Sequence, residues 1–206
     1  MYVLVFMFVM LVIVFTLLGV LVYGREISNP RWVAVGTGDV ALAYSDDGEI
    51  WEGIEGVFGE ENVGNGYDIF KAGNRWVAVG DDEDDSNIWY SDDAEEWIAI
   101  EGPFGSGNAT SVYYANGIWV VTGIDENDEG TLWWSNDAEE WTEVEDVAFE
   151  RSGLVVQYPG PWLAGGTMNG DAGEIVLASS DGIEWENVNF PETGDDAYVN
   201  TFFSHI

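Results

Sequence analysis

The chain contains one sequence pattern that occurs four times in register. Each copy opens with an alternating stretch such as RWVAVG, passes through a variable polar loop and a short aromatic segment, and ends at a second tryptophan. The opening tryptophans are 44, 43 and 43 residues apart, and the closing ones 46, 44 and 44. The opening set is Trp32, Trp76, Trp119 and Trp162, and the closing set is Trp51, Trp97, Trp141 and Trp185. Such self-similarity predicts four copies of one supersecondary unit that stack on one another.

Short β-strands account for each repeat, so the predicted fold class is all-β. The opening stretch, the aromatic segment and the residues from the closing tryptophan give three strands, and the last three repeats have a further strand in front (YDIFKA, TSVYYA and GLVVQY). A period in the low forties with four strands per unit is typical of a β-propeller blade. We therefore expect a small propeller of four blades of ~44 residues each.

The first repeat lacks this leading strand, and the end of the chain offers a replacement. Residues 196–206 read DAYVNTFFSHI and align with the leading strand of the third repeat. A C-terminal strand that completes the first blade would close the ring and remove an unpaired sheet edge. The competing arrangement is a half-ring that pairs with a second chain or with a missing continuation.

The residues before the repeats predict a membrane segment. Residues 2–23 carry no charge and are almost wholly apolar, and as a helix they would span ~33 Å, which is enough for a bilayer. We assign residues 1–24 to a single transmembrane anchor and residues 25–206 to the propeller, which we expect outside the cell. A cleaved signal peptide is the alternative, and the protein would then be secreted.

The charge of the chain limits its partners. Asp and Glu number 39 against 5 Lys and Arg, which gives a formal net charge of −34. Nucleic-acid binding is excluded, because no basic face is available to release counterions from phosphates. The chain has no cysteine, so disulfides and thiolate metal sites are excluded as well. The acidic residues indicate either a solvated surface, such as an adaptation to high salt, or a surface that binds cations or a basic partner.

A turn motif ends each repeat and carries a family resemblance. The four copies read YSDDGEIW, YSDDAEEW, WSNDAEEW and SSDGIEW. They resemble the Asp-box (BNR) repeats of sialidase-like and sortilin-like propellers, although the motif is one residue shorter and Ala94 and Ala138 replace glycine. We assign a structural role to these residues, because Ser and Asp bond their own turn and Trp buries a large ring. The set is Ser45, Asp47, Trp51, Ser91, Asp93, Trp97, Ser135, Asp137, Trp141, Ser179, Asp181 and Trp185.

The resemblance implies a glycosidase fold, but the sequence does not support catalysis. Sialidases of this family use three arginines for the substrate carboxylate, a Tyr–Glu nucleophile and an Asp acid/base. This chain has only Arg25, Arg31, Arg75 and Arg151, and Arg31 and Arg75 occupy matching structural positions in their repeats. With so many acids a carboxylate pair of the general glycosidase kind stays open, but none stands out. The only histidine, His205, aligns with a turn residue. We therefore predict that the protein is not an enzyme and has no catalytic residues.

The loops between the second and third strands are candidates for cation binding. They are rich in oxygen ligands, and equivalent loops of a propeller share one face, here the face opposite the Asp boxes. Calcium takes 6–8 oxygen ligands, but the loop from Asp125 lacks the closing Glu of an EF-hand because its twelfth position is Asn136. We expect no obligatory cofactor, with Ca²⁺ as the candidate ion and solvated hairpin tips as the alternative. The candidate ligands are Asp81, Asp82, Asp84, Asp85, Asp125, Asn127, Asp128 and Asp171.

These features predict a membrane-anchored binding or scaffold module that presents its loop face to a protein, a glycan or a cation. One alternative is a structural subunit of an envelope or filament that assembles through its apolar helix. A second alternative is a glycan-cleaving hydrolase with a sialidase-like fold.

Overall fold

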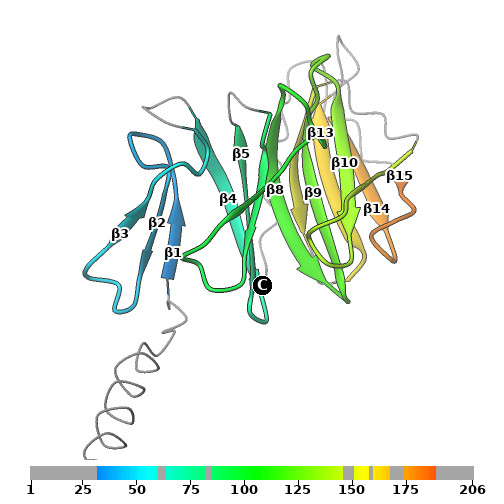
Figure 1. The fold of residues 1–206 in the computed structure, drawn as a ribbon. Coiled ribbons are helices and arrows are strands. Elements are labelled where there is room, and N and C mark those ends of the chain that lie inside the picture. Colours follow the sequence, from blue (N-terminus) through cyan, green and yellow to red (C-terminus); the bar gives the residue numbers. More distant parts are fainter. Residues whose placement is uncertain are drawn as a thin grey trace, which may run out of the picture.

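Four antiparallel β-sheets make up the described part of the chain. The structure is a computed structural model, and it describes residues 32–59, 64–81, 85–145, 151–157, 160–167 and 174–188. Within these ranges the chain forms fifteen β-strands joined by turns. Each sheet corresponds to one sequence repeat, and Figure 1 shows the sheets side by side in chain order. The all-β prediction and the four repeat units are confirmed for these residues. We call the sheets blades 1 to 4.

Blade 1 has three strands. They are β1 (Trp32–Val35), β2 (Leu42–Ser45) and β3 (Glu52–Ile54), paired in the order β1-β2-β3. In the other blades the strand equivalent to β1 pairs on both sides, whereas β1 pairs with β2 alone among the described strands. A lone bridge between Thr37 and Asn65 links blade 1 to the next sheet. Among the described residues, blade 1 therefore lacks the leading strand that the other three blades have.

Blades 2 to 4 have four strands each. Blade 2 comprises β4 (Asn65–Ala72), β5 (Arg75–Asp81), β6 (Ile88–Ser91) and β7 (Ile98–Ile100). Blade 3 comprises β8 (Asn108–Ala115), β9 (Ile118–Ile124), β10 (Gly130–Ser135) and β11 (Thr142–Glu143). Blade 4 comprises β12 (Arg151–Gln157), β13 (Trp162–Thr167), β14 (Glu174–Ser179) and β15 (Glu186–Val188). The last strand of each blade begins one residue after the closing tryptophan, and not at it as the sequence predicted.

The alternation of side chains gives each blade two different faces. In blade 2, Trp76 lies opposite Ser91 on one face, and Val77 lies opposite Tyr90 on the other. Successive residues of a strand point to opposite sides of the sheet, so the opening and closing tryptophans share one face. That face is directed at the preceding blade, and we call it the back face. The other, directed at the following blade, is the front face.

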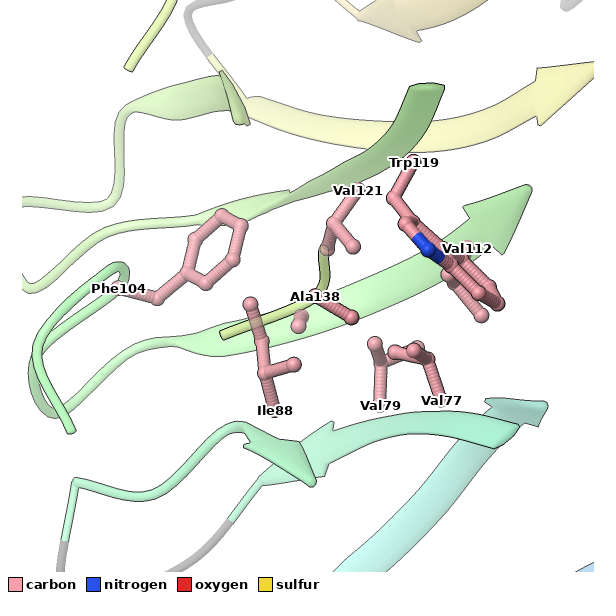
Figure 2. Packing of buried hydrophobic residues seen from close by; sticks show 9 residues of the cluster. Val77, Val79, Ile88, Phe104, Val112, Trp119, Val121 and Ala138 are labelled. Carbon is pink, nitrogen blue, oxygen red and sulfur yellow. The ribbon is translucent and has the colours of Figure 1, made fainter. Parts of the chain in front are cut away.

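Three buried clusters lie between neighbouring blades and form the core. In the middle one, Val77, Val79 and Ile88 from the front of blade 2 pack against Trp119 and Val121 from the back of blade 3 (Figure 2). Equivalent clusters join blade 1 to blade 2 and blade 3 to blade 4. The hydrophobic core is therefore a series of interfaces, and no blade buries its apolar side chains alone.

The connection from blade 1 to blade 2 and the connection from blade 2 to blade 3 each place a phenylalanine in the interface between the two blades. Phe58 and Phe104 follow the last strands of blades 1 and 2, and both are 1% exposed. Each ring lies over a glycine of the next blade: a Cβ on Gly80 would be 2.8 Å from the Phe58 ring, and one on Gly123 would be 2.5 Å from the Phe104 ring. These two glycines therefore leave the space that the rings occupy.

The described blades form a row with blade 1 and blade 4 at opposite ends (Figure 1). The expected contact between these two blades is not made by the described residues. The strand predicted for residues 196–206 lies outside them, so closure of the ring stays a prediction. Residues 1–31, including the predicted membrane span at 2–23, also lie outside the described ranges. No helix long and apolar enough to cross a membrane is found within those ranges.

Candidate functional site

Each Asp box uses its own polar side chains to hold its turn. In blade 2, the Ser91 hydroxyl donates to Asp93 at 3.1 Å and accepts the amide of Ala94 at 2.8 Å. Asp93 Oδ1 also accepts the amides of Glu95 and Glu96, both at 2.9 Å. The same set of bonds recurs at the other three boxes, on Asp47, Asp137 and Asp181.

These bonds change the acidity of the box carboxyls. Amide hydrogen bonds to the charged form lower the pKa of Asp47, Asp137 and Asp181 below the usual value. Burial pulls the pKa of Asp93 upward, but the amides of Glu96 and Glu95 outweigh it and the net pKa is lowered. A carboxylate stabilised in this way stays ionised and is a poor proton donor. The geometry therefore suits a fastened turn better than an acid catalyst.

The residue that follows the bonded aspartate in each box has a left-handed backbone. Its φ is +78° at Gly48 and +83° at Gly182, and +63° and +65° where Ala94 and Ala138 replace glycine. Both alanine side chains are fully buried, so their methyl groups contribute packing that offsets part of the conformational cost. The closing tryptophans complete these turns, because each ring Nε1 donates to the carbonyl of the residue that follows the aspartate. These tryptophans are Trp97, Trp141 and Trp185.

Arg75 joins two blades at the Asp-box end. Its guanidinium pairs with Asp92 of blade 2 at 2.8 Å and with Glu139 of blade 3 at 3.0 Å, and it also donates to the carbonyl of Asp137. Arg75, Asp92 and Asp137 border a shallow depression of about 370 Å³ that is lined also by Tyr114 and Asn136. Because its donors are directed at these carboxylates and this carbonyl, Arg75 links blades, which agrees with the structural role expected from its position in the repeat.

At the opposite end of the blades lies the acidic loop face. Asp81, the last residue of β5, accepts the backbone and side-chain amides of Asn65 and the hydroxyl of Tyr67 at 2.7 Å. Burial and the neighbouring Asp81 carboxylate raise the pKa of Tyr67 to about 12. Asp81 is thus bonded to the strand beside it. Asp85, also predicted as a ligand, lies in the same β5–β6 connection with a positive φ of 61°.

The loop between β9 and β10 is closed by the side chain of Asp125. Its Oδ1 accepts the amides of Asn127 and Glu129 at 2.9 and 2.8 Å, and its Oδ2 accepts the Asn127 side chain at 3.0 Å. Burial raises the pKa of Asp125, but these bonds from Asn127 and Glu129 outweigh it and the net pKa is lowered. The residues whose spacing resembles the start of a calcium loop therefore form a hairpin tip that is held by hydrogen bonds to Asp125.

The tip of this loop is exposed and negatively charged. Glu126, Asn127, Asp128 and Glu129 are all exposed. Glu126 lies beside Gly105 of the blade 2–blade 3 connection, where an added Cβ would be 3.4 Å from its carboxylate. Hairpin tips and blade connections therefore share this end of the molecule, as the repeat pattern predicted.

The described part of the chain does not gather these acids into a metal centre. No group of three or more His, Asp or Glu side chains there is arranged to hold an ion. Asp81 and Asp125 already accept several local hydrogen bonds. Asp82, Asp84 and Asp171 lie outside the described residues, so a Ca²⁺ site at this face stays a prediction.

One half-buried acid between blades was not anticipated from the sequence. Asp68 on β4 accepts the hydroxyl of Ser111 and the amide of Val112 on β8, at 2.9 and 3.0 Å. Both strands carry a bulge just before these residues, between Gly66 and Asp68 and between Ala109 and Ser111. The bulges can be recognised only when the pairing of the strands is known. The alignment of the repeats therefore did not reveal the hydrogen bonds from Ser111 and Val112 to Asp68.

Comparison with known proteins supports the fold and leaves the activity open. No family model matches the chain, and no curated protein matches its sequence. Its structure is similar to that of the Niastella koreensis GH74 enzyme, at a TM-score of 0.53 and 17% identity, over 75% of this chain and 28% of that one. It is also similar to YCF48, in a structure bound to D1 peptide, at a TM-score of 0.50 and 19% identity, over 77% and 49%.

A Trypanosoma rangeli sialidase matches at a TM-score of 0.40 and 14% identity, over 71% of this chain and 31% of that one. The chain spans less than half the length of each of these three proteins. The first two likenesses show a β-propeller type of fold. The Asp-box motif stays a resemblance.

Proposed function

We propose that the chain is a non-catalytic binding or scaffold module that presents its acidic loop face to a basic protein surface, a glycan or a cation. The observation that carries this proposal is the exposed acidic tip between β9 and β10, held rigid by Asp125. A rigid loop on a blade scaffold presents its charges with little loss of conformational entropy on binding.

The absence of a recognised catalytic set favours binding over hydrolysis. The box aspartates are fastened to their turns, and Arg75 is paired with two carboxylates and a carbonyl. The alternatives are a glycan-cleaving hydrolase, which is the activity type of the GH74 neighbour, and an envelope or filament subunit assembled through residues 2–23. Neither is supported by a specific contact in the described residues.

Two further parts of the proposal concern the ends of the chain. Residues 2–23 would hold the module at a membrane with the blades outside the cell, or the module would be secreted if that segment is cleaved. Residues 196–206 would add a strand to the open edge of β1, either within one chain, which closes the ring, or in a second copy, because that edge offers unpaired backbone groups. Deletion of 196–206 should then lower the thermal stability of the chain, and an unchanged melting curve would contradict the pairing.

The binding proposal is tested on the full chain in detergent. Wild type is screened against Ca²⁺, a basic peptide and a glycan panel, beside a variant with Glu126→Gln, Asp128→Asn and Glu129→Gln. The control removes three exposed charges from the Asp-box end instead, by Glu96→Gln, Glu140→Gln and Glu184→Gln. We expect the loop variant alone to lose binding. Equal loss in both variants, or turnover of a glycoside by the wild type, would reject the proposal.

A further inference from the structure

The back face of blade 1 is uncovered, although it is built like three faces that are buried. The opening tryptophan is 7% exposed in blade 2, 2% in blade 3 and 0% in blade 4, but Trp32 of blade 1 is 56% exposed. The closing tryptophan follows the same trend, since Trp51 is 43% exposed whereas its three equivalents are half-buried. Ala34, between them on the same face, is exposed too.

The Asp box of blade 1 adds a further exposed apolar side chain, next to Trp51 in the sequence. Ile50 occupies the position that Glu96, Glu140 and Glu184 occupy in the other boxes. It is 72% exposed, which makes it the most exposed of the large hydrophobic residues that the structure describes. In a chain with 39 acidic residues, isoleucine replaces glutamate on the one blade whose back face is bare. The exposed rings of Trp32 and Trp51 on one face of the blade form the kind of apolar surface that marks an interaction site.

The chain itself shows what covers such a face. In all three internal interfaces the back face is covered by the front face of another blade, through valine, leucine or isoleucine from that blade's second and third strands. The front face of blade 4 carries residues of the same kind, including Leu163 and Ala178, which are half-buried, and Val188, which is 39% exposed. Blade 4 of the same chain lies at the far end of the row (Figure 1).

We infer that the back face of blade 1 docks the front face of blade 4 of a second copy of this chain. The contact is head to tail, and a two-fold axis between the copies gives two identical contacts and a closed pair. Each contact repeats the packing already present three times within the chain. Because each copy carries a net charge of −34, the pair forms only where salt screens the repulsion between them.

Association of the full chain in detergent, measured by light scattering at low and at molar KCl, is the first test. We expect a dimer at molar KCl that weakens at low salt. Ala34→Glu should weaken association about tenfold or more, because it places a charge in the middle of the back face, where the equivalent residues Ala78 and Ala164 are fully buried. Ile50→Glu is the matched control, since the other three boxes carry a glutamate there that stays exposed although their back faces are covered, and it should leave association unchanged.

Crosslinking identifies the faces, because the chain has no cysteine of its own. With a thiol crosslinker that spans about 10 Å, the spacing of two packed sheets, a mixture of Ala34→Cys and Ala178→Cys chains should give a crosslinked dimer, and a mixture of Ala34→Cys with Glu140→Cys should not. A chain carrying both Ala34→Cys and Ala178→Cys that crosslinks as a monomer would show closure within one chain and overturn the inference. A monomer at every salt concentration, or a dimer insensitive to Ala34→Glu, would overturn it as well.

Discussion

The carboxylate of Asp68 on β4 accepts a 2.9 Å hydrogen bond from the hydroxyl of Ser111 on β8. The same oxygen accepts the amide of Val112 at 3.0 Å, so one side chain joins the leading strands of blades 2 and 3. Apolar packing is tolerant of small sliding motions, whereas these directional bonds fix the relative height of the two strands. Asp68 therefore sets the register between neighbouring blades.

Removing either partner should loosen this interface by different amounts. Ser111→Ala removes one hydrogen bond and should lower the free energy of unfolding by about 1 kcal/mol. Asp68→Ala also leaves the Val112 amide without its acceptor and should cost about 2 kcal/mol. Urea unfolding at high salt measures both, with the exposed Ser106→Ala as control. Equal, negligible effects of the two substitutions would mean that the bonds do not stabilise the interface.

The pH dependence of stability should have opposite signs for Asp68 and for a box aspartate. Burial raises the pKa of Asp68 above its usual value, and the bonds from Val112, Ser111 and Ile69 offset this only in part. A raised pKa in the folded state contributes stability below the unfolded pKa, and this contribution is lost as the pH rises through the folded value. The pKa of Asp137 is lowered, so its contribution is present above the unfolded value and is lost as the pH falls through the folded pKa.

Two substitutions separate these contributions. The stability of wild type relative to Asp68→Asn should fall as the pH rises from about 4 toward neutrality. The stability of wild type relative to Asp137→Asn should instead fall as the pH is lowered below about 4. Thermal melts across this pH range give the difference in melting temperature between wild type and each variant. The titration of the acidic surface affects both proteins alike and cancels in this difference. Slopes of the same sign would refute the assignment.

Replacing the glycine that follows the box aspartate should lower stability most in a blade whose back face is covered by another blade. A Cβ on Gly182 would lie 3.2 Å from the fully buried ring of Trp162, and one on Gly48 would lie 3.3 Å from the ring of Trp32, which is 56% exposed. Both residues have positive φ, so alanine costs about 1 kcal/mol in conformation at either place.

Gly182→Ala should cost about 1 kcal/mol more than Gly48→Ala, because Trp162 has no room to move and Trp32 has. The comparison uses urea unfolding at protein concentrations low enough to keep the chain unassociated. Equal costs at the two positions would mean that the neighbouring tryptophan does not constrain the turn.

The sequence was most informative where structure is local. Spacing and alternation predicted the strands, the side of the sheet on which Trp76 lies, and the turns around Asp47 and Asp93. The contacts between blades were harder to foresee, because Phe58 finds its place only against a glycine of the following sheet, Gly80. The exposure of Trp32 was equally hidden, since its sequence context matches those of three buried tryptophans and only its place at the end of the row distinguishes it.

High salt should stabilise the whole molecule, because its charge is so unbalanced. At a net charge of −34, the folded chain holds its acids closer together than the unfolded chain does, and their repulsion opposes folding. Screening at molar KCl shortens the range of that repulsion to ~3 Å, so the melting temperature of the full chain should rise by roughly 10 °C relative to low salt. Sucrose, which favours compact states without screening charge, serves as the control.

The combined Glu96→Gln, Glu140→Gln and Glu184→Gln variant should melt higher than wild type at low salt and similarly at molar salt, since it has already lost part of the repulsion. A melting temperature independent of KCl would mean that the acidic surface carries no net cost to the fold.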